Sequence, residues 1–347
     1  MKHRLTVLMI ALLVVASSAA YSQAKEKKAD SAYVFSVVKS LPVTPVKNQY
    51  RSGTCWSYSA ISFIESELLR TMKDTFDLSE MFCVRKCYTD KAEKYVRYHG
   101  KYNFGGGGAA HDVTYVIKNY GMVPEAAYTG NMPGEDKPIH GEMDAVLAAD
   151  VDAVIKNPNK QLSPVWKQGF DGLADAYLGK VPEKFTYKGK EYTPKSFAAM
   201  TGLNADDYIE ISSYTHHPFY SKFIIEVEDN WLMDEVYNVP VDEMEQIIDN
   251  SLKNGYTVAW AADVSEKGFV TSNKGVAVLP AAISEEMSDA EIAKWEALPE
   301  REKEKELYKL EKPVAEISVT QEMRQTAFDN YETTDDHGMH IVGTAKN

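Results

Sequence analysis

Apolar residues recur at helical spacing soon after the first fifty positions. Between residues 56 and 72 the apolar positions fall three or four apart, with charged residues between them: Ile61, Ile64, Leu68 and Leu69. This period is typical of an amphipathic helix, and it predicts a helix that begins at or just before Cys55. Asp77-Leu78-Ser79-Glu80-Met81 has the form of a capping segment that opens a second helix. A third helix is expected over Val113 to Tyr120.

The pattern changes along the chain. Residues 135 to 255 read mostly helical, apart from a short hairpin over Tyr187 to Tyr192. A run rich in Glu and Lys over residues 284 to 311 indicates a charged surface helix or insertion. Three later segments are strand-like: Tyr256 to Ala262, Ile317 to Val319 and His340 to Thr344. Helices at the front and strands towards the end favour the α+β class.

The first twenty residues differ from the rest. Lys2 and Arg4 precede an apolar run from Leu5 to Val15, and small residues then offer a cleavage site at Ser18-x-Ala20, with Ser22-x-Ala24 as a second option. This arrangement is typical of a secretory signal peptide. The alternative, a membrane anchor, needs a longer apolar run to cross roughly 30 Å of hydrocarbon. We therefore expect residues 1–20 to be a signal peptide and residues 21–40 a mobile segment. The protein would then be exported to the periplasm or beyond, without stable membrane association.

Composition narrows the function classes. Hydrophobic residues make up 44% of the 347 and charged residues 26%, which is ordinary for a soluble globular protein with one large domain or two. The net charge is −13, and an acidic protein has little attraction for phosphate backbones, which argues against nucleic-acid binding.

The chain has three cysteines, an odd number. Cys83 and Cys87 lie one helical turn apart, and they are either two small buried residues or a strained local disulfide. Two lone thiols without nearby histidines are a poor metal site, so no metal and no cofactor is predicted. Cys55 is then the thiol left for chemistry.

The surroundings of Cys55 suit a nucleophile. A thiol reacts as thiolate, with a reference pKa of about 8.5, and a helix start supplies N–H groups that lower it. Gly53 allows a tight approach of the chain. Gln49 lies six positions upstream, so its amide and the Cys55 N–H could both donate to a tetrahedral oxyanion.

The segment Gln49-x5-Cys55-Trp56-Ser57, with Gly53, resembles the active-site segment of the papain-like (C1) cysteine peptidases. Ser52 stands where most relatives have a cysteine. In this respect the segment resembles the bleomycin hydrolase and aminopeptidase C branch of the family. The resemblance runs from about Pro42 to Gly343. It implies a papain-like two-lobed fold over residues 41–347, with a helical lobe, an antiparallel β-barrel-like lobe and a mostly helical insertion at 130–250.

The resemblance also implies the site residues. Asp336-His337-Gly338-Met339 fits the family's histidine strand and makes His337 the general base, with His340 as the alternative. In the run from Phe104 to Asp112, Gly107 and Gly108 would present backbone to an extended peptide, with Trp56 also at the substrate site. The implied function is hydrolysis of peptide bonds through a thioester, as an aminopeptidase or an endopeptidase. Peptides or proteins are the expected partners, and an oligomer is left open.

The family's third catalytic member, an asparagine in an Asn-Ser-Trp-Gly strand after the histidine, has no counterpart after His337. Two interpretations follow from the pattern. The chain is C-terminally incomplete, with an active intact relative, or it is an inactive papain-fold protein that binds peptides as a scaffold. A third function, transglutaminase-like acyl transfer, would need an aspartate-bearing strand soon after the histidine, and the sequence offers none.

Overall fold

The computed structural model describes residues 33–271, 274–283 and 287–347. The predicted signal peptide, residues 1–20, lies outside the described residues, as do residues 21–32. The described chain divides into two compact units. The larger comprises Phe35–Glu266 and Ser318–Asn347, and the smaller comprises Lys267–Ile317 together with residues 33 and 34.

Three predicted helices form the centre of the larger unit. They are α2 (Cys55–Met72), α3 (Glu80–Arg97) and α4 (Ala110–Tyr120). Helix α2 begins at Cys55, as the apolar period predicts, and buries Ile61, Ile64 and Leu68 in the main core. Helix α3 is capped by Ser79, whose hydroxyl accepts the N–H of Phe82. The local sequence signals therefore place these helices correctly.

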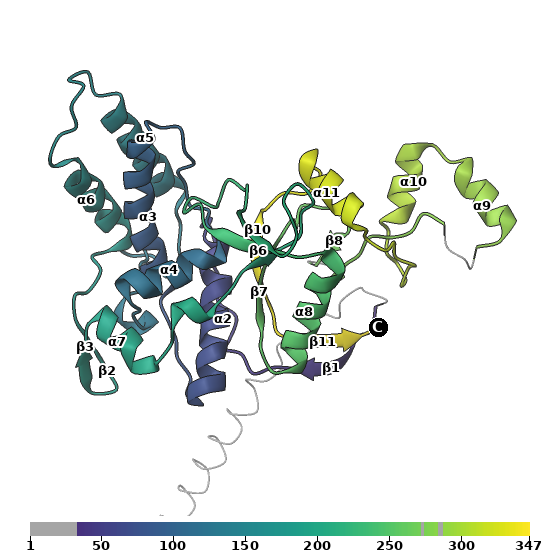
Figure 1. Cartoon of the computed structure of the whole chain (residues 1–347), viewed down its shortest axis with the longest axis horizontal. Coiled ribbons are helices and arrows are strands. Elements are labelled where there is room, and N and C mark those ends of the chain that lie inside the picture. Colours follow the sequence, from purple (N-terminus) through teal and green to yellow (C-terminus); the bar gives the residue numbers. More distant parts are fainter. Residues whose placement is uncertain (1–32, 272–273, 284–286) are drawn as a thin grey trace, which may run out of the picture. The chain divides into compact units, whose positions relative to one another are not determined.

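Two further helices pack against α3. They are α5 (Gly141–Ile155) and α6 (Trp166–Leu178), and Figure 1 shows them grouped with α3. Arg85 of α3 reaches α6 and pairs with Asp175 at 2.7 Å. Cys83 and Cys87 of α3 are free and buried, so they act as small core residues and form no disulfide.

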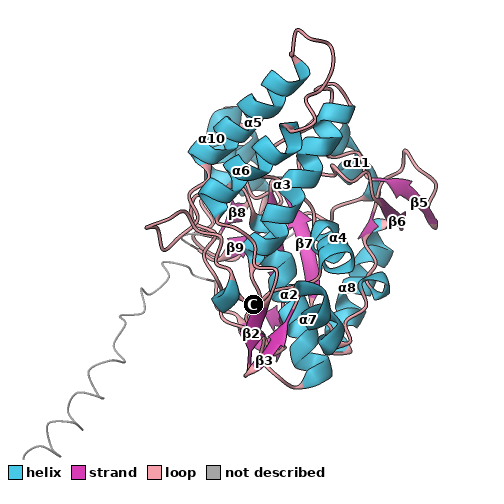
Figure 2. Ribbon diagram, turned by 90° about the vertical axis from the view of Figure 1, so that its left-hand side faces the viewer, coloured by secondary structure: helices cyan, strands magenta, loops and turns pink. Residues whose placement is uncertain are grey.

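The predicted hairpin is present. Strands β2 (Phe185–Tyr187) and β3 (Lys190–Tyr192) pair antiparallel beside helix α7 (Pro194–Thr201), as Figure 2 shows. Phe197 of α7 is buried against aromatic rings of both strands. Two single turns of 3-10 helix, η1 (Glu125–Ala127) and η2 (Ala205–Asp207), flank this region.

The mostly helical prediction for residues 135–255 is wrong over residues 211–238. Residues 211–238 form a three-stranded sheet in the order β4 (Ile211–Ser212), β6 (Glu235–Asn238), β5 (Ser221–Ile224), and helix α8 (Val241–Lys253) follows it. The side chain of Asn238 is fully buried and bonds both to the N–H and to the carbonyl of Tyr214. A single buried amide leaves no periodic pattern in the sequence, so the sequence pattern does not predict this sheet.

Two long-range strand pairs close the larger unit. Strand β7 (Val258–Ala262) pairs antiparallel with β10 (His337–Ile341), and β1 (Ser36–Ser40) pairs with β11 (Gly343–Lys346). β1 lies inside the segment 21–40 that the sequence predicts to be mobile, so Ser36–Ser40 correct that prediction. The strand expected over Ile317 to Val319 is absent; an isolated bridge between Pro280 and Glu316 stands just before it.

The smaller unit contains the charged run. Strands β8 (Phe269–Val270) and β9 (Val276–Ala277) pair, and helices α9 (Asp289–Glu296) and α10 (Glu300–Leu307) follow. A small core of Val276, Val278 and Leu310 holds it together. Neither helix buries a residue, in agreement with the predicted charged surface.

The fold class is α+β, as predicted. Among the described residues the strands form sheets of two or three and do not close into a barrel. The last helix, α11 (Gln321–Asp329), precedes β10. No helix in the described ranges is long and apolar enough to cross a membrane.

Acidic side chains gather behind α2 around a single lysine. The ammonium of Lys47 lies 3.3 Å from Glu65 and 2.8 Å from Glu80. Burial raises the pKa of Glu80 to about 7. Burial, followed by the negative charge of Glu80, raises the pKa of Glu125 to about 8. One oxygen of Glu125 is buried and has no hydrogen-bond partner among the described residues. Folding therefore disfavours the charged form of Glu125.

We predict that Glu125→Gln stabilises the protein in a pH-dependent way. A carboxyl whose pKa is raised by folding from 4.5 to about 8 favours the fold below pH 4.5 and loses that contribution as pH rises through 8. After discounting for partial exposure, the variant should gain about 1–2 kcal/mol at pH 8.5 and almost nothing at pH 4.5. Thermal unfolding at the two pH values measures this.

Glu183→Gln is the matched control, because that side chain is exposed; it should shift the melting temperature at neither pH. An equal loss of stability at both pH values in Glu125→Gln would contradict the expectation.

Candidate active site

Cys55 is the first residue of α2. Its thiol is half-buried, and burial raises its pKa. Hydrogen bonds from the backbone N–H groups of Gly338, Trp56 and Cys55 itself act in the opposite direction. The helix start thus supplies the N–H groups that the sequence predicts, but burial outweighs them.

Strand β10 lies directly against the first turns of α2. A Cβ at Gly338 would stand 2.7 Å from the Ser59 hydroxyl, 3.1 Å from the Trp56 Cα and 3.2 Å from the Cys55 carbonyl oxygen. This contact, together with the N–H of Gly338 on the thiol, brings the start of β10 to Cys55. His337 is the residue before Gly338, so the structure places the predicted base next in the chain to a group that binds the thiol.

His340 lies farther along α2. Its Nδ1 is 2.9 Å from the hydroxyl of Ser62, and its ring meets Phe63 edge-on. Burial lowers its pKa to about 4. Ser62 is seven residues beyond Cys55, which is roughly 10 Å along a helix at about 1.5 Å per residue. His340 is therefore held against the middle of α2, away from the thiol.

Gln49 holds the loop before α2. Its side-chain Nε2 donates to the carbonyl of Ser52 at 3.0 Å, and the Ser52 hydroxyl donates back to the Gln49 carbonyl at 2.8 Å. An amide nitrogen carries two N–H groups. One N–H of Gln49 thus remains for a substrate oxygen.

Trp56 supports the glycine run. Its indole N–H donates to the carbonyl of Gly106 at 2.9 Å, and its side chain is 2% exposed. A Cβ built on Gly53 would stand 3.8 Å from Gly106, in ordinary van der Waals contact, so the two segments are neighbours. The buried indole thus supports the glycine run, and contact of Trp56 with a substrate stays a prediction.

The two glycines predicted to bind substrate have partners within the protein. The ammonium of buried Lys91 donates to the carbonyls of Gly105 and Gly107. The N–H of Gly108 donates to the carboxylate of Asp229. No local sequence motif marks Lys91 or Asp229. Lys91 lies inside helix α3, and Asp229 lies in the loop between β5 and β6.

A buried polar group lies beneath the glycine run. Asp112 is 0% exposed and accepts the indole N–H of Trp231 at 2.6 Å. Burial raises its pKa to about 6. Next to it, burial alone would lower the pKa of His111, but its hydrogen bond to Glu210 and the Glu210 charge raise that pKa to about 9. The His111 ring is thus held by its hydrogen bond to Glu210.

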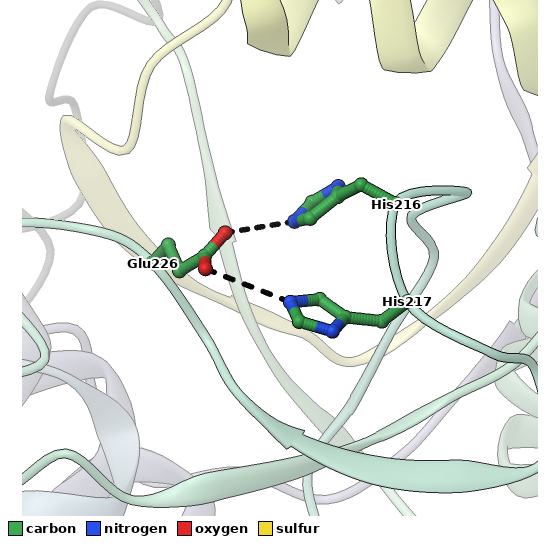
Figure 3. Close-up of side chains that lie close together, drawn as sticks. All are labelled: His216, His217 and Glu226. Atoms are coloured by element: carbon green, nitrogen blue, oxygen red, sulfur yellow. Dashed lines mark hydrogen bonds and ion pairs between the residues drawn. The ribbon is translucent and has the colours of Figure 1, made fainter.

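His216, His217 and Glu226 are the described residues that could hold a metal ion, and Figure 3 shows both imidazoles directed at the carboxylate. The side-chain oxygen of Gln325 accepts the N–H of Thr215 at 2.6 Å, so its NH2 faces Nδ1 of His216 at 2.9 Å. That Nδ1 must accept, which leaves the proton on Nε2 to bond Glu226 at 2.8 Å. A hydrogen-bonded chain therefore accounts for His216 and Glu226, while Nε2 of His217 lies 3.6 Å from the same carboxylate.

Part of the chain is similar to a known protein family. Residues 33–164 match the family model of the papain family cysteine proteases. Aminopeptidase C of Streptococcus thermophilus is 21% identical over 301 residues, covering 72% of this chain. Aminopeptidase G of Lactobacillus delbrueckii subsp. lactis is 24% identical over 271 residues, covering 65% of this chain.

The chain spans 66% and 60% of the length of these two aminopeptidases. Among solved structures, PepW from Lactobacillus rhamnosis superposes with a TM-score of 0.63 at 18% identity, covering 91% of this chain and 73% of that one. At this identity the likeness concerns the fold.

We predict that Gly338→Ala weakens the reaction of Cys55. The added methyl would meet Ser59 and the α2 backbone, so β10 must move away from α2, at about 1–3 kcal/mol. Labelling of Cys55 by iodoacetamide should slow by about 10- to 100-fold.

Gly172→Ala on α6 is the control, because a Cβ there meets nothing within 4 Å. Adding Ser59→Ala to Gly338→Ala removes the tightest contact and should restore part of the rate. Unchanged labelling in Gly338→Ala would show that the close packing is not needed.

Proposed function

We propose that this papain-family (C1) chain, a homologue of the aminopeptidases C of the bleomycin hydrolase branch, is a cysteine peptidase that removes amino-terminal residues from peptides. One observation carries the proposal: the thiol at the start of α2 accepts the N–H of the residue that follows His337. A nucleophile and a base from distant parts of the sequence are thereby brought together.

The reaction begins with proton transfer from the Cys55 thiol to the His337 imidazole. Burial favours the neutral thiol, so the imidazole must accept the proton for the thiolate to form. The N–H groups of Gly338 and Trp56 stabilise the thiolate. The sulfur then attacks the peptide carbonyl carbon, and a C–S bond forms.

The oxygen of the tetrahedral intermediate accepts hydrogen bonds from the free N–H of Gln49 and the backbone N–H of Cys55. His337 then gives its proton to the leaving amine, and the C–N bond breaks to leave a thioester. Water attacks the thioester while His337 takes a proton from it. The freed carboxylic acid leaves and the thiol is restored.

We further propose that the protein is exported after removal of a signal peptide. The basic start and short apolar run of residues 1–20 support this. In such a compartment the peptidase would act on peptides outside the cytoplasm.

Cys55→Ser should abolish turnover of an aminoacyl amide reporter, with a loss of at least about 10³-fold, because the hydroxyl is a far weaker nucleophile at neutral pH. His337→Ala should cause a similar loss, since His337 is the group that takes up the thiol proton in the proposed mechanism. Rates with both variants and with the wild type measure this.

Peptide mass analysis after brief iodoacetamide treatment is the companion measurement. The label should appear at Cys55 and not at Cys83 or Cys87, which are buried. If Cys55 reacts no faster than a free model thiol and the wild type turns over no reporter, the chain is a peptide-binding scaffold instead.

A further inference from the structure

Asp229 stands at the glycine run of the candidate active site. It lies in the loop between β5 and β6, and its half-buried carboxylate accepts the N–H of Gly108. A Cβ placed on Gly107 would overlap that carboxylate. Its negative charge acts on the thiol of Cys55. Asp229 therefore borders the place where a substrate carbonyl must meet the sulfur.

The negative charge of Asp229 is not balanced by an ion pair. Among the residues that the structure describes, no side-chain nitrogen of Lys, Arg or His lies within 4.0 Å of a carboxylate oxygen of Asp229 or of the nearby Asp335. The charge of Lys91 does act on Asp229, but its ammonium is bound to the glycine carbonyls. Burial, followed by the charge of Asp229, raises the pKa of Asp335 to about 6. The site thus holds negative charge that a bound cation would relieve.

The glycine backbone offers little to a longer peptide. An extended substrate would pair with the N–H and carbonyl groups of Gly107 and Gly108, but the Gly107 carbonyl is bound to Lys91 and the Gly108 N–H to Asp229. The carboxylate also covers Gly107. A residue preceding the cleaved one would have to displace these bonds.

The dimensions suit an amino terminus. In a residue whose carbonyl carbon the sulfur attacks, the amino nitrogen lies about 2.5 Å from that carbon. Adding an attack distance of about 3–3.5 Å and a charged hydrogen bond of about 2.8 Å places the matching carboxylate within roughly 9 Å of the sulfur. Asp229 is next to Gly107, and a Cβ built on Gly53, two residues before Cys55, would lie 3.8 Å from Gly106 and 4.0 Å from the nitrogen of Gly107.

We propose that the Asp229 carboxylate binds the α-ammonium group of peptide substrates, with Asp335 adding to the field, and so restricts this site to free amino termini. The inference rests on the proposed peptidase activity and names the residue that determines its specificity. The site then carries its own amino-terminal anchor in the β5–β6 loop.

The test compares two reporters that differ at the amino group, alanyl amide and its N-acetylated form, with wild type and Asp229→Asn. The wild type should prefer the free amine. Asp229→Asn should lose about 10- to 100-fold in kcat/KM on the free amine, with the loss mainly in KM, and should change little on the acetylated form. Iodoacetamide labelling of Cys55 should be as fast or faster, because a charge that disfavours the thiolate is gone.

Glu228→Gln is the matched control: it removes one negative charge from the neighbouring exposed position and should keep the preference. Asp229→Ser is a second variant, with a smaller side chain, and should behave as Asp229→Asn does. The inference is wrong if the preference survives in both Asp229 variants, or if both lose Cys55 labelling, which would mean that Asp229 acts through folding. If the proposed function itself is wrong, the wild type will cleave neither reporter.

Discussion

The close contact between β10 and the first turns of α2 is the constraint on which the site depends. It exists because position 338 has no side chain: Trp56, Ser59 and the Cys55 carbonyl fill the space a Cβ would need. Through this contact the thiol accepts the backbone N–H of Gly338, and β10 is held in place against α2. The pairing of β10 with β7, His337 opposite Ala262, then fixes the strand from its other edge.

The glycine run, on the other side of the site, is held in place by charged side chains. Lys91 is buried and binds the carbonyls of the glycine run, while Asp229 and Asp112 meet the same run from the loop side and from below. A buried charge is tolerated when it is hydrogen-bonded and compensated. The run therefore owes its position to groups of opposite sign on either side of it. Its glycines allow that approach because side chains would collide with Asp229 and Trp56.

The parts of this structure that follow from sequence are those set by local rules. The period of Ile61, Ile64 and Leu68 predicts α2 and its start at Cys55, and Ser79 predicts the start of α3. The sheet at residues 211–238 escapes such rules, because its strands are two to four residues long and depend on a buried amide, Asn238. Lys91 and Asp229 escape them too, since their roles come from tertiary neighbours.

The pairing of α2 with β10 also governs when the site can form. Ser62 and His340, which meet across it, are 278 positions apart in sequence. Contacts of such separation form late in folding, because the closure entropy of the intervening chain must be overcome first. Until β10 docks, Cys55 stands on a formed helix without its histidine strand. The site is therefore complete only once residues far apart in sequence have met, and until that contact forms Cys55 lacks the N–H of Gly338.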